Sequence, residues 1–154
     1  MVPIKEAINS GAWLHCEHKY GYNTYQFRIK VDSFKILNLK EVDDPEEIDG
    51  LDENSKLYML GIEVINITKE PVALHSSIDF LLLVDQDGFK FPIFKERHLY
   101  RVSEFGKKHK LQRFDFKELL PKIKAVGSIL FQLPDDDEAE YFISIQNDGT
   151  VQEV

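Results

Sequence analysis

The sequence has little cysteine, no long apolar run and fewer basic than acidic residues. Its one cysteine, Cys16, cannot form a disulfide within the chain, so nothing marks an oxidising compartment. No stretch reaches the ~20 apolar residues that span a bilayer, and the first residues lack the apolar run of a signal peptide. We therefore expect no transmembrane segment. The location is cytoplasmic if Met1 is native, and exported if Met1 begins a trimmed mature domain.

The charge balance also disfavours nucleic acid as a partner. There are 27 Asp and Glu against 19 Lys and Arg, a formal net charge of -8. Affinity for nucleic acid comes mainly from basic groups that neutralise phosphates. We therefore expect no general nucleic-acid binding.

The chain contains enough apolar residues to form one hydrophobic core. Its 154 residues are 43% hydrophobic and include 11 Phe and 6 Tyr, side chains large enough to fill a core. This is the length of one ordinary domain, so we expect residues 1–154 to form a single domain.

The dominant hydrophobic period is two, which is typical of strands. In "TYQFRIKV" every second residue from Tyr25 to Val31 is apolar, and the residues between them are polar. The phase then slips at Asp32 and Ser33, which predicts a β-bulge. Helical periodicity is weak and confined to residues 3–10 and 115–124.

Several segments fit strands joined by turns. "KLYMLGIEVINIT" is apolar on both parities, which predicts a central strand buried on two sides. "DQDG" predicts a turn, and Pro92 in "FKFPIF" predicts that the return strand lies at an edge or a bulge. Residues 128–133 predict a strand, "YFISIQ" a strand that pairs back with it after an acidic turn, and "TVQEV" a short terminal strand. About seven to nine strands with few helices predict an all-β, antiparallel, immunoglobulin-like sandwich.

Three stretches of the second half carry a resemblance to a known family. They are "LYMLGIEVINITKEPVAL", with Asn66 before a Lys-Glu-Pro turn, "LLLVDQDGFKF", with Asp87-Gly88, and "LLPKIKAVGSILFQLP", with Leu120-Pro121 leading to Gly127. Over about residues 57 to 145 the chain resembles a widespread bacterial family of immunoglobulin-like sandwich domains of unknown function, many of them secreted proteins or lipoproteins. The resemblance implies a sandwich fold and a binding or accessory role, and it carries over no catalytic residue.

The stretch "HCEH" contains the residue types that bind zinc or copper, namely His15, Cys16, Glu17 and His18. Side chains alternate along a strand, so Cys16 and His18 share one face and His15 and Glu17 the other. Two ligands per face make half a site. We expect a strand with a small buried cysteine, followed by a hairpin turn at "KYGYN" with Gly21 or Asn23 at positive φ. A metal protein or a Cys/His enzyme built on "HCEH" is the rival hypothesis.

Other reactive arrangements are weaker. There is no glycine-rich phosphate loop, so we expect no nucleotide cofactor. Asp85 and Asp87, or Asp135–Asp137, could hold calcium at one end of a sandwich, but the EF-hand spacing is missing and acidic turns are usually solvated. We therefore expect no catalytic residue, no metal site and no cofactor.

Two charged tracts suit a partner better than a substrate. Residues 41–54 hold eight carboxylates and no Lys or Arg, whereas residues 95–113 hold seven Lys or Arg against two Glu. Either these are solvated loops, or the basic one is an electrostatic docking face for another protein, or for an anionic membrane or cell-wall polymer. We expect a non-enzymatic module that docks to another macromolecule, in the first instance a protein, through Arg97, Arg101, Lys107, Lys108, Lys110 and Arg113. Trp13, Tyr20, Tyr22 and Tyr25 are candidates for an aromatic contact patch, or else cover one end of the core.

If the basic tract serves association and not folding, reversing Lys107, Lys108 and Lys110 to Glu should leave the unfolding midpoint nearly unchanged, since exposed charges contribute at most about 1 kcal/mol each. The triple variant should capture less of any acidic partner at low salt, where the Debye length of roughly 30 Å at 0.01 M lets charges act at a distance. Equal recovery of the same partners at low salt would contradict a role for this tract.

Overall fold

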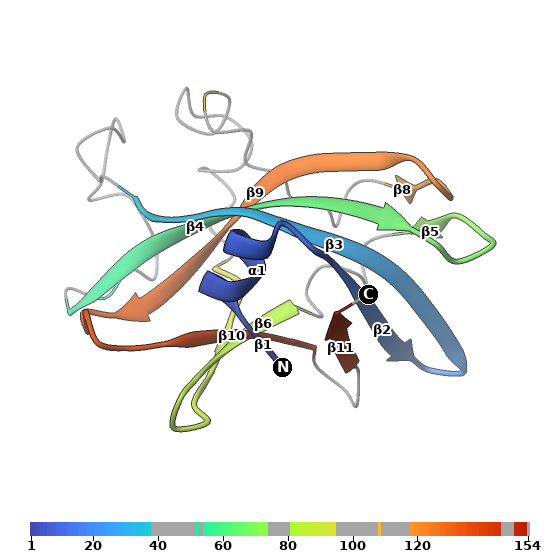
Figure 1. The fold of residues 1–154 in the computed structure, drawn as a ribbon. Helices are drawn as coiled ribbons and strands as arrows, with labels where there is room; N and C mark the ends of the chain where they lie inside the picture. Colours follow the sequence, from blue (N-terminus) through green and yellow to red (C-terminus); the bar gives the residue numbers. More distant parts are fainter. Residues whose placement is uncertain are drawn as a thin grey trace.

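The chain forms two antiparallel β-sheets packed face to face, as Figure 1 shows. The structure is a computed structural model that describes residues 1–37, 52, 54–73, 81–94, 108, 118–145 and 150–153. The large sheet has the order β11 (Thr150–Glu153), β2 (Trp13–Tyr20), β3 (Asn23–Ile36), β4 (Ser55–Asn66) and β9 (Lys124–Pro134). The small sheet has the order β1 (Val2–Pro3), β10 (Tyr141–Ile145), β6 (Leu81–Asp85) and β7 (Lys90–Pro92). The predicted antiparallel β-sandwich is therefore confirmed.

Three smaller elements complete the described residues. The two-residue strands β5 (Val72–Ala73) and β8 (Glu118–Leu119) pair with each other, and α1 spans Ile4–Ser10. Helix α1 lies between the two sheets (Figure 1) and buries Ile4 and Ala7 in the core. It ends at Gly11, whose positive φ of 61° lets its N–H reach back to Ala7 and Ile8. No helix among these residues is long and apolar enough to cross a bilayer.

The core follows from the period of two. In β3, Phe27, Ile29 and Val31 are buried, while Arg28 between them is exposed. Their neighbours across the sheet are buried on the same side, including Leu14 and Cys16 of β2 and Ile62 and Val64 of β4. Strand β4 pairs on both edges, as predicted, but Met59, Glu63 and Ile65 on its other face are only half-buried. The prediction of burial on two sides is therefore too strong, because this face is the outside of the sandwich.

The two predicted hairpin turns are confirmed. Gly21, between β2 and β3, has a φ of 61°, which glycine adopts without a Cβ clash. In "DQDG" the backbone N–H of Gly88 donates to the Asp85 carbonyl (3.1 Å), and the Asp85 carboxylate accepts from the N–H groups of Asp87 and Phe89 (2.9 Å each). Both turns could be predicted from the sequence because each depends only on the residues of the turn itself.

The predicted β-bulge is also present. The register between β3 and β4 shifts between Val31 and Ser33, so that Asp32 is the extra residue. Opposite the bulge, Gly61 has no side chain, and a Cβ there would lie 2.6 Å from the Ser33 hydroxyl. Beyond the bulge the other parity points inward, and Phe34 packs against the core, where its ring stacks on Tyr58 at 4.9 Å.

One predicted pairing is wrong. The "YFISIQ" strand does not pair back with the strand before it, because β9 lies in the large sheet whereas β10 lies in the small sheet between β1 and β6. The acidic turn at residues 135–140 therefore carries the chain from one layer to the other. Pro92 does lie on an edge strand of the small sheet, as predicted. Next to it, an isolated bridge between Ile93 and Phe131 links the two sheets on this side.

The weak helical patterns had different outcomes. Helix α1 confirms the one at residues 3–10, whereas residues 118–124 contain β8 and a turn instead of a helix. Pro121 cannot donate a backbone N–H to a helix, which explains the difference. Residues 115–117 and most of the acidic and basic tracts lie outside the described residues.

Asn66, at the end of β4, connects the turn that follows β4 to the turn between β8 and β9 through hydrogen bonds. Its side-chain amide donates to the carbonyls of Glu70 (3.0 Å) and Leu119 (2.9 Å), and its side-chain oxygen accepts from the N–H of Thr68 (2.8 Å). Its backbone carbonyl accepts from the N–H of Lys122 (2.9 Å). Asn66 is fully buried, so each of these groups would be costly to leave without a partner. The stretches that carried the family resemblance around Asn66 and Leu120-Pro121 thus meet in space.

We expect Asn66→Ala to lower the free energy of unfolding by about 2–3 kcal/mol, because it removes one buried and two part-buried hydrogen bonds of a fully buried side chain. For a chain of this size that corresponds to about 5–10 °C in the thermal midpoint, measured by circular dichroism. Asn23→Ala is the matched control, since Asn23 is exposed at the start of β3. Equal midpoints for the two variants would contradict this role of Asn66.

Candidate functional site

The four residues of "HCEH" lie on β2 and divide between its two faces as predicted. Cys16 and His18 point inward and are buried, whereas His15 and Glu17 lie on the outer face and are half-buried. The register confirms this division, because Cys16 lies opposite the buried Phe27 and His15 opposite the exposed Arg28. The sheet itself therefore separates the four side chains into two pairs.

Neither pair has the surroundings of a reactive centre. Burial raises the pKa of the Cys16 thiol to about 12, so the nucleophilic thiolate is scarce at neutral pH. Among the described residues, no three His, Cys, Asp or Glu side chains come together in a group that could hold a metal ion. His75, His98 and His109 lie outside the described residues.

Few of the residues of the predicted basic site fall within the part of the chain that the structure describes. Lys108 is exposed, and the other members of the predicted basic site, Arg97, Arg101, Lys107, Lys110 and Arg113, lie outside the described residues. Among the calcium candidates, Asp85 accepts from the N–H groups of Asp87 and Phe89, and Asp136 accepts from the N–H of Glu138 (3.0 Å). Asp135 forms an ion pair with Lys56 (2.7 Å).

The candidate aromatic patch is not one surface. Trp13 lies on the outer face of β2, opposite Lys30, whereas Tyr25 packs against the core. Tyr22 is fully exposed at the tip of the β2–β3 hairpin. The Tyr20 side chain is outside the described part of the chain.

The outer face of the large sheet gathers side chains that the sequence reasoning did not connect. Strand register places them in two adjacent rows across β2, β3, β4 and β9, and residues directly opposite each other share a face. One row contains His15, Arg28, Ile65 and Lys124, and the other contains Trp13, Lys30, Glu63 and Val126. We call these eight residues the outer-face site.

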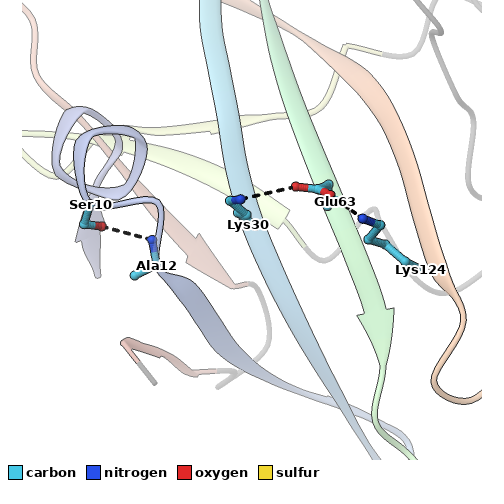
Figure 2. Close-up of polar contacts among 5 residues, drawn as sticks. All are labelled: Ser10, Ala12, Lys30, Glu63 and Lys124. Carbon is cyan, nitrogen blue, oxygen red and sulfur yellow. Dashed lines mark hydrogen bonds and ion pairs between the residues drawn. The ribbon is translucent and has the colours of Figure 1, made fainter.

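Glu63 is the electrostatic centre of the outer-face site. Figure 2 shows its carboxylate between two lysines from the neighbouring strands, Lys124 of β9 at 2.9 Å and Lys30 of β3 at 3.8 Å. The hydrogen bond from Lys124 holds the pKa of the Glu63 carboxyl below its usual value. These two ion pairs connect β3, β4 and β9 through their side chains, in addition to the backbone hydrogen bonds of the sheet.

The bulge adds a second carboxyl group to this cluster. Asp32 is the extra residue of β3, and its carboxyl lies close enough to that of Glu63 for the two to influence each other's pKa. Desolvation and the negative charge of Glu63 raise the pKa of Asp32. Two neighbouring carboxyl groups thus have their pKa values moved in opposite directions.

Sequence reasoning missed this site because its members come from distant segments. Arg28 and Lys30 were visible as a wet face of one strand, but Glu63 lay in a strand expected to be buried on both sides. Lys124 fell at the end of a weak helical pattern. The polar Glu63 within "LGIEVINI" was the one available signal that this strand has an outer face.

Comparison with known proteins supports the fold and assigns no activity. No protein-family model and no curated protein sequence matches the chain. Among solved structures, a conserved hypothetical protein from Bacillus anthracis is similar over 92% of this chain and 96% of its own, with 14% identity and a TM-score of 0.52. At that identity the similarity shows the fold alone. An uncharacterized beta-sandwich protein from Clostridium difficile is 11% identical, covers 82% of this chain and 84% of its own, and has a TM-score of 0.44.

The opposite pKa shifts predict opposite effects of two isosteric changes. The ionised Asp32 is disfavoured in the fold, so Asp32→Asn should raise the thermal midpoint at pH 7, by about 1–3 °C. This gain should vanish as the pH falls through the raised pKa of Asp32, since wild type is then neutral there too. Glu63→Gln should lower the midpoint at pH 7, and its deficit should shrink as the pH falls through the lowered pKa of Glu63. Thermal scans from pH 7 to about pH 3 measure both. Shifts of the same sign at pH 7 would contradict the arrangement.

Proposed function

We propose that this protein is a non-enzymatic module that docks to another protein through the outer face of its large sheet. The observation that carries the proposal is the charge of that face. On a chain of net charge -8, the described strands place five cations on the outer face against three acids, Glu17, Asp32 and Glu63. The cations are Lys19, Arg28, Lys30, Lys35 and Lys124. A basic surface on an acidic protein favours a partner that presents acidic groups.

The chemistry of the face also suits a protein partner. Trp13, Ile65 and Val126 lie among the cations, and the first two are half-buried while Val126 is exposed. Trp and Arg are the residues most enriched at the centres of protein interfaces. An extended strand face gives such side chains a rigid support, because each lies on a strand that is paired in the large sheet.

A metal protein or Cys/His enzyme built on "HCEH" is less well supported. It would need His15 and Glu17 to act with Cys16 and His18 through the sheet, and the raised pKa of the Cys16 thiol opposes its use as a nucleophile. We also propose the finer assignment of the sandwich as immunoglobulin-like. It is supported by the two-layer antiparallel architecture and by the contacts among Asn66, Leu119 and Lys122 in the stretches that carry the resemblance.

The test is charge reversal on the face with a matched control. We expect wild type and the control variant Lys5→Glu/Lys90→Glu to capture the same proteins from a native lysate. Lys19→Glu/Arg28→Glu should lose at least one of them. All four lysine and arginine side chains are exposed, so the three proteins should have similar thermal midpoints.

The lost protein should then bind purified wild type in isothermal titration calorimetry, with an affinity that falls as salt is raised. Two results would overturn the proposal. One is capture of the same proteins in the same amounts by all three chains. The other is an affinity for the purified partner that reversal of Lys19 and Arg28 leaves unchanged.

A further inference from the structure

The connection from β8 to β9 presents two large apolar side chains to solvent on a tight turn. The N–H of Ile123 donates to the carbonyl of Leu120 (3.4 Å), with Pro121 and Lys122 between them. Leu120 is 46% exposed and Ile123 is 57% exposed. Because the two residues close the same turn, their backbones lie close together.

This turn is backbone-strained and yet firmly held. Lys122 has a φ of 65°, and it is the one non-glycine residue with positive φ in the part of the chain that the structure describes. A lysine in that region costs free energy that a glycine would not. The turn is nevertheless fixed from below by the buried Asn66, which accepts from the N–H of Lys122 and donates to the carbonyl of Leu119. Such strain, kept by surrounding hydrogen bonds, is characteristic of functional positions.

The turn continues directly into the outer-face site. Lys124 follows Ile123 and lies opposite Ile65, which in turn lies opposite Arg28. Val126, two residues further, is 41% exposed. Along the chain, the apolar pair is therefore followed by the row that contains Lys124 and Arg28 and preceded by Glu118.

We propose that the Leu120–Ile123 turn is the apolar anchor of the docking face, and that its partner is an acidic protein segment with a large apolar side chain at its centre. This inference rests on the proposed function and names the chemistry of its partner. The apolar side chain contacts Leu120 and Ile123, and the flanking carboxylates lie over Lys122, Lys124 and Arg28. Apolar contacts removed from water supply most of the affinity of such interfaces, whereas the charges supply orientation and association rate.

Three synthetic peptides of equal length test the idea against the isotopically labelled, full-length protein. The first has a central Leu-Phe pair flanked by glutamates, the second has Ser-Ser in place of Leu-Phe, and the third has lysines in place of the glutamates. We expect the first peptide to shift the backbone amide resonances of residues 120–126 most and to bind tightest. Ile123→Ser should weaken it about 5-fold or more.

Ile36→Ser is the matched control, because Ile36 is 50% exposed on β3 at the far end of the same sheet. It should leave the affinity for the first peptide unchanged. Both changes remove an exposed apolar side chain, so similar thermal midpoints establish that neither effect is due to unfolding.

Four results would overturn the anchor. They are equal binding of the Ser-Ser peptide, equal binding of the lysine peptide, no binding of the first peptide, and an equal effect of Ile36→Ser and Ile123→Ser. Phosphatidylglycerol vesicles that shift the same resonances when the first peptide does not would assign the turn to a lipid surface instead. If Lys19→Glu/Arg28→Glu abolishes capture of a native partner while Ile123→Ser does not, docking stands and the anchor is wrong.

Discussion

The bulge in β3 decides what the large sheet presents on each of its faces. A strand has two side-chain parities, and one inserted residue exchanges them. Before Asp32, the odd-numbered residues from Phe27 to Val31 fill the core; after it, Phe34 takes the inward position and stacks on Tyr58. The same insertion brings Asp32 beside Glu63 on the outside. One extra residue thus shapes both the aromatic end of the core and the electrostatics of the outer-face site.

The features predictable from the sequence were those with local causes. The turns at Gly21 and Gly88, the bulge at Asp32 and the edge position of Pro92 each follow from a few adjacent residues. The change of sheet at residues 135–140 was not predictable in this way, because a polar turn has the same composition whether it joins neighbours in one sheet or crosses between two. The Lys30–Glu63–Lys124 cluster also required the register of three strands. The hydrogen bonds of Asn66 were not predicted. The family resemblance singled out the residue but gave it no physical role.

The outer-face site combines rigidity with a mixed charge. Glu63 occupies one side of both Lys30 and Lys124, so these lysines are oriented before any partner arrives, and less side-chain entropy is lost on binding. Arg28 is exposed and lies on the strand next to Glu63, and no ion pair joins its side chain to another of the described residues. If the proposed docking holds, ordered and adaptable cations on one sheet face, with Trp13 at its margin, would let a partner be selected by shape as well as by charge.

The first two strands of the sandwich pair with its last two strands. Strand β1 pairs with β10 in the small sheet, and β2 pairs with β11 in the large sheet. Until β10 and β11 are in place, β1 and the outer edge of β2 lack their strand partners. Contacts between such distant segments slow folding and extend the life of aggregation-prone intermediates. We therefore expect the pairings of β1 with β10 and of β2 with β11 to form late in folding.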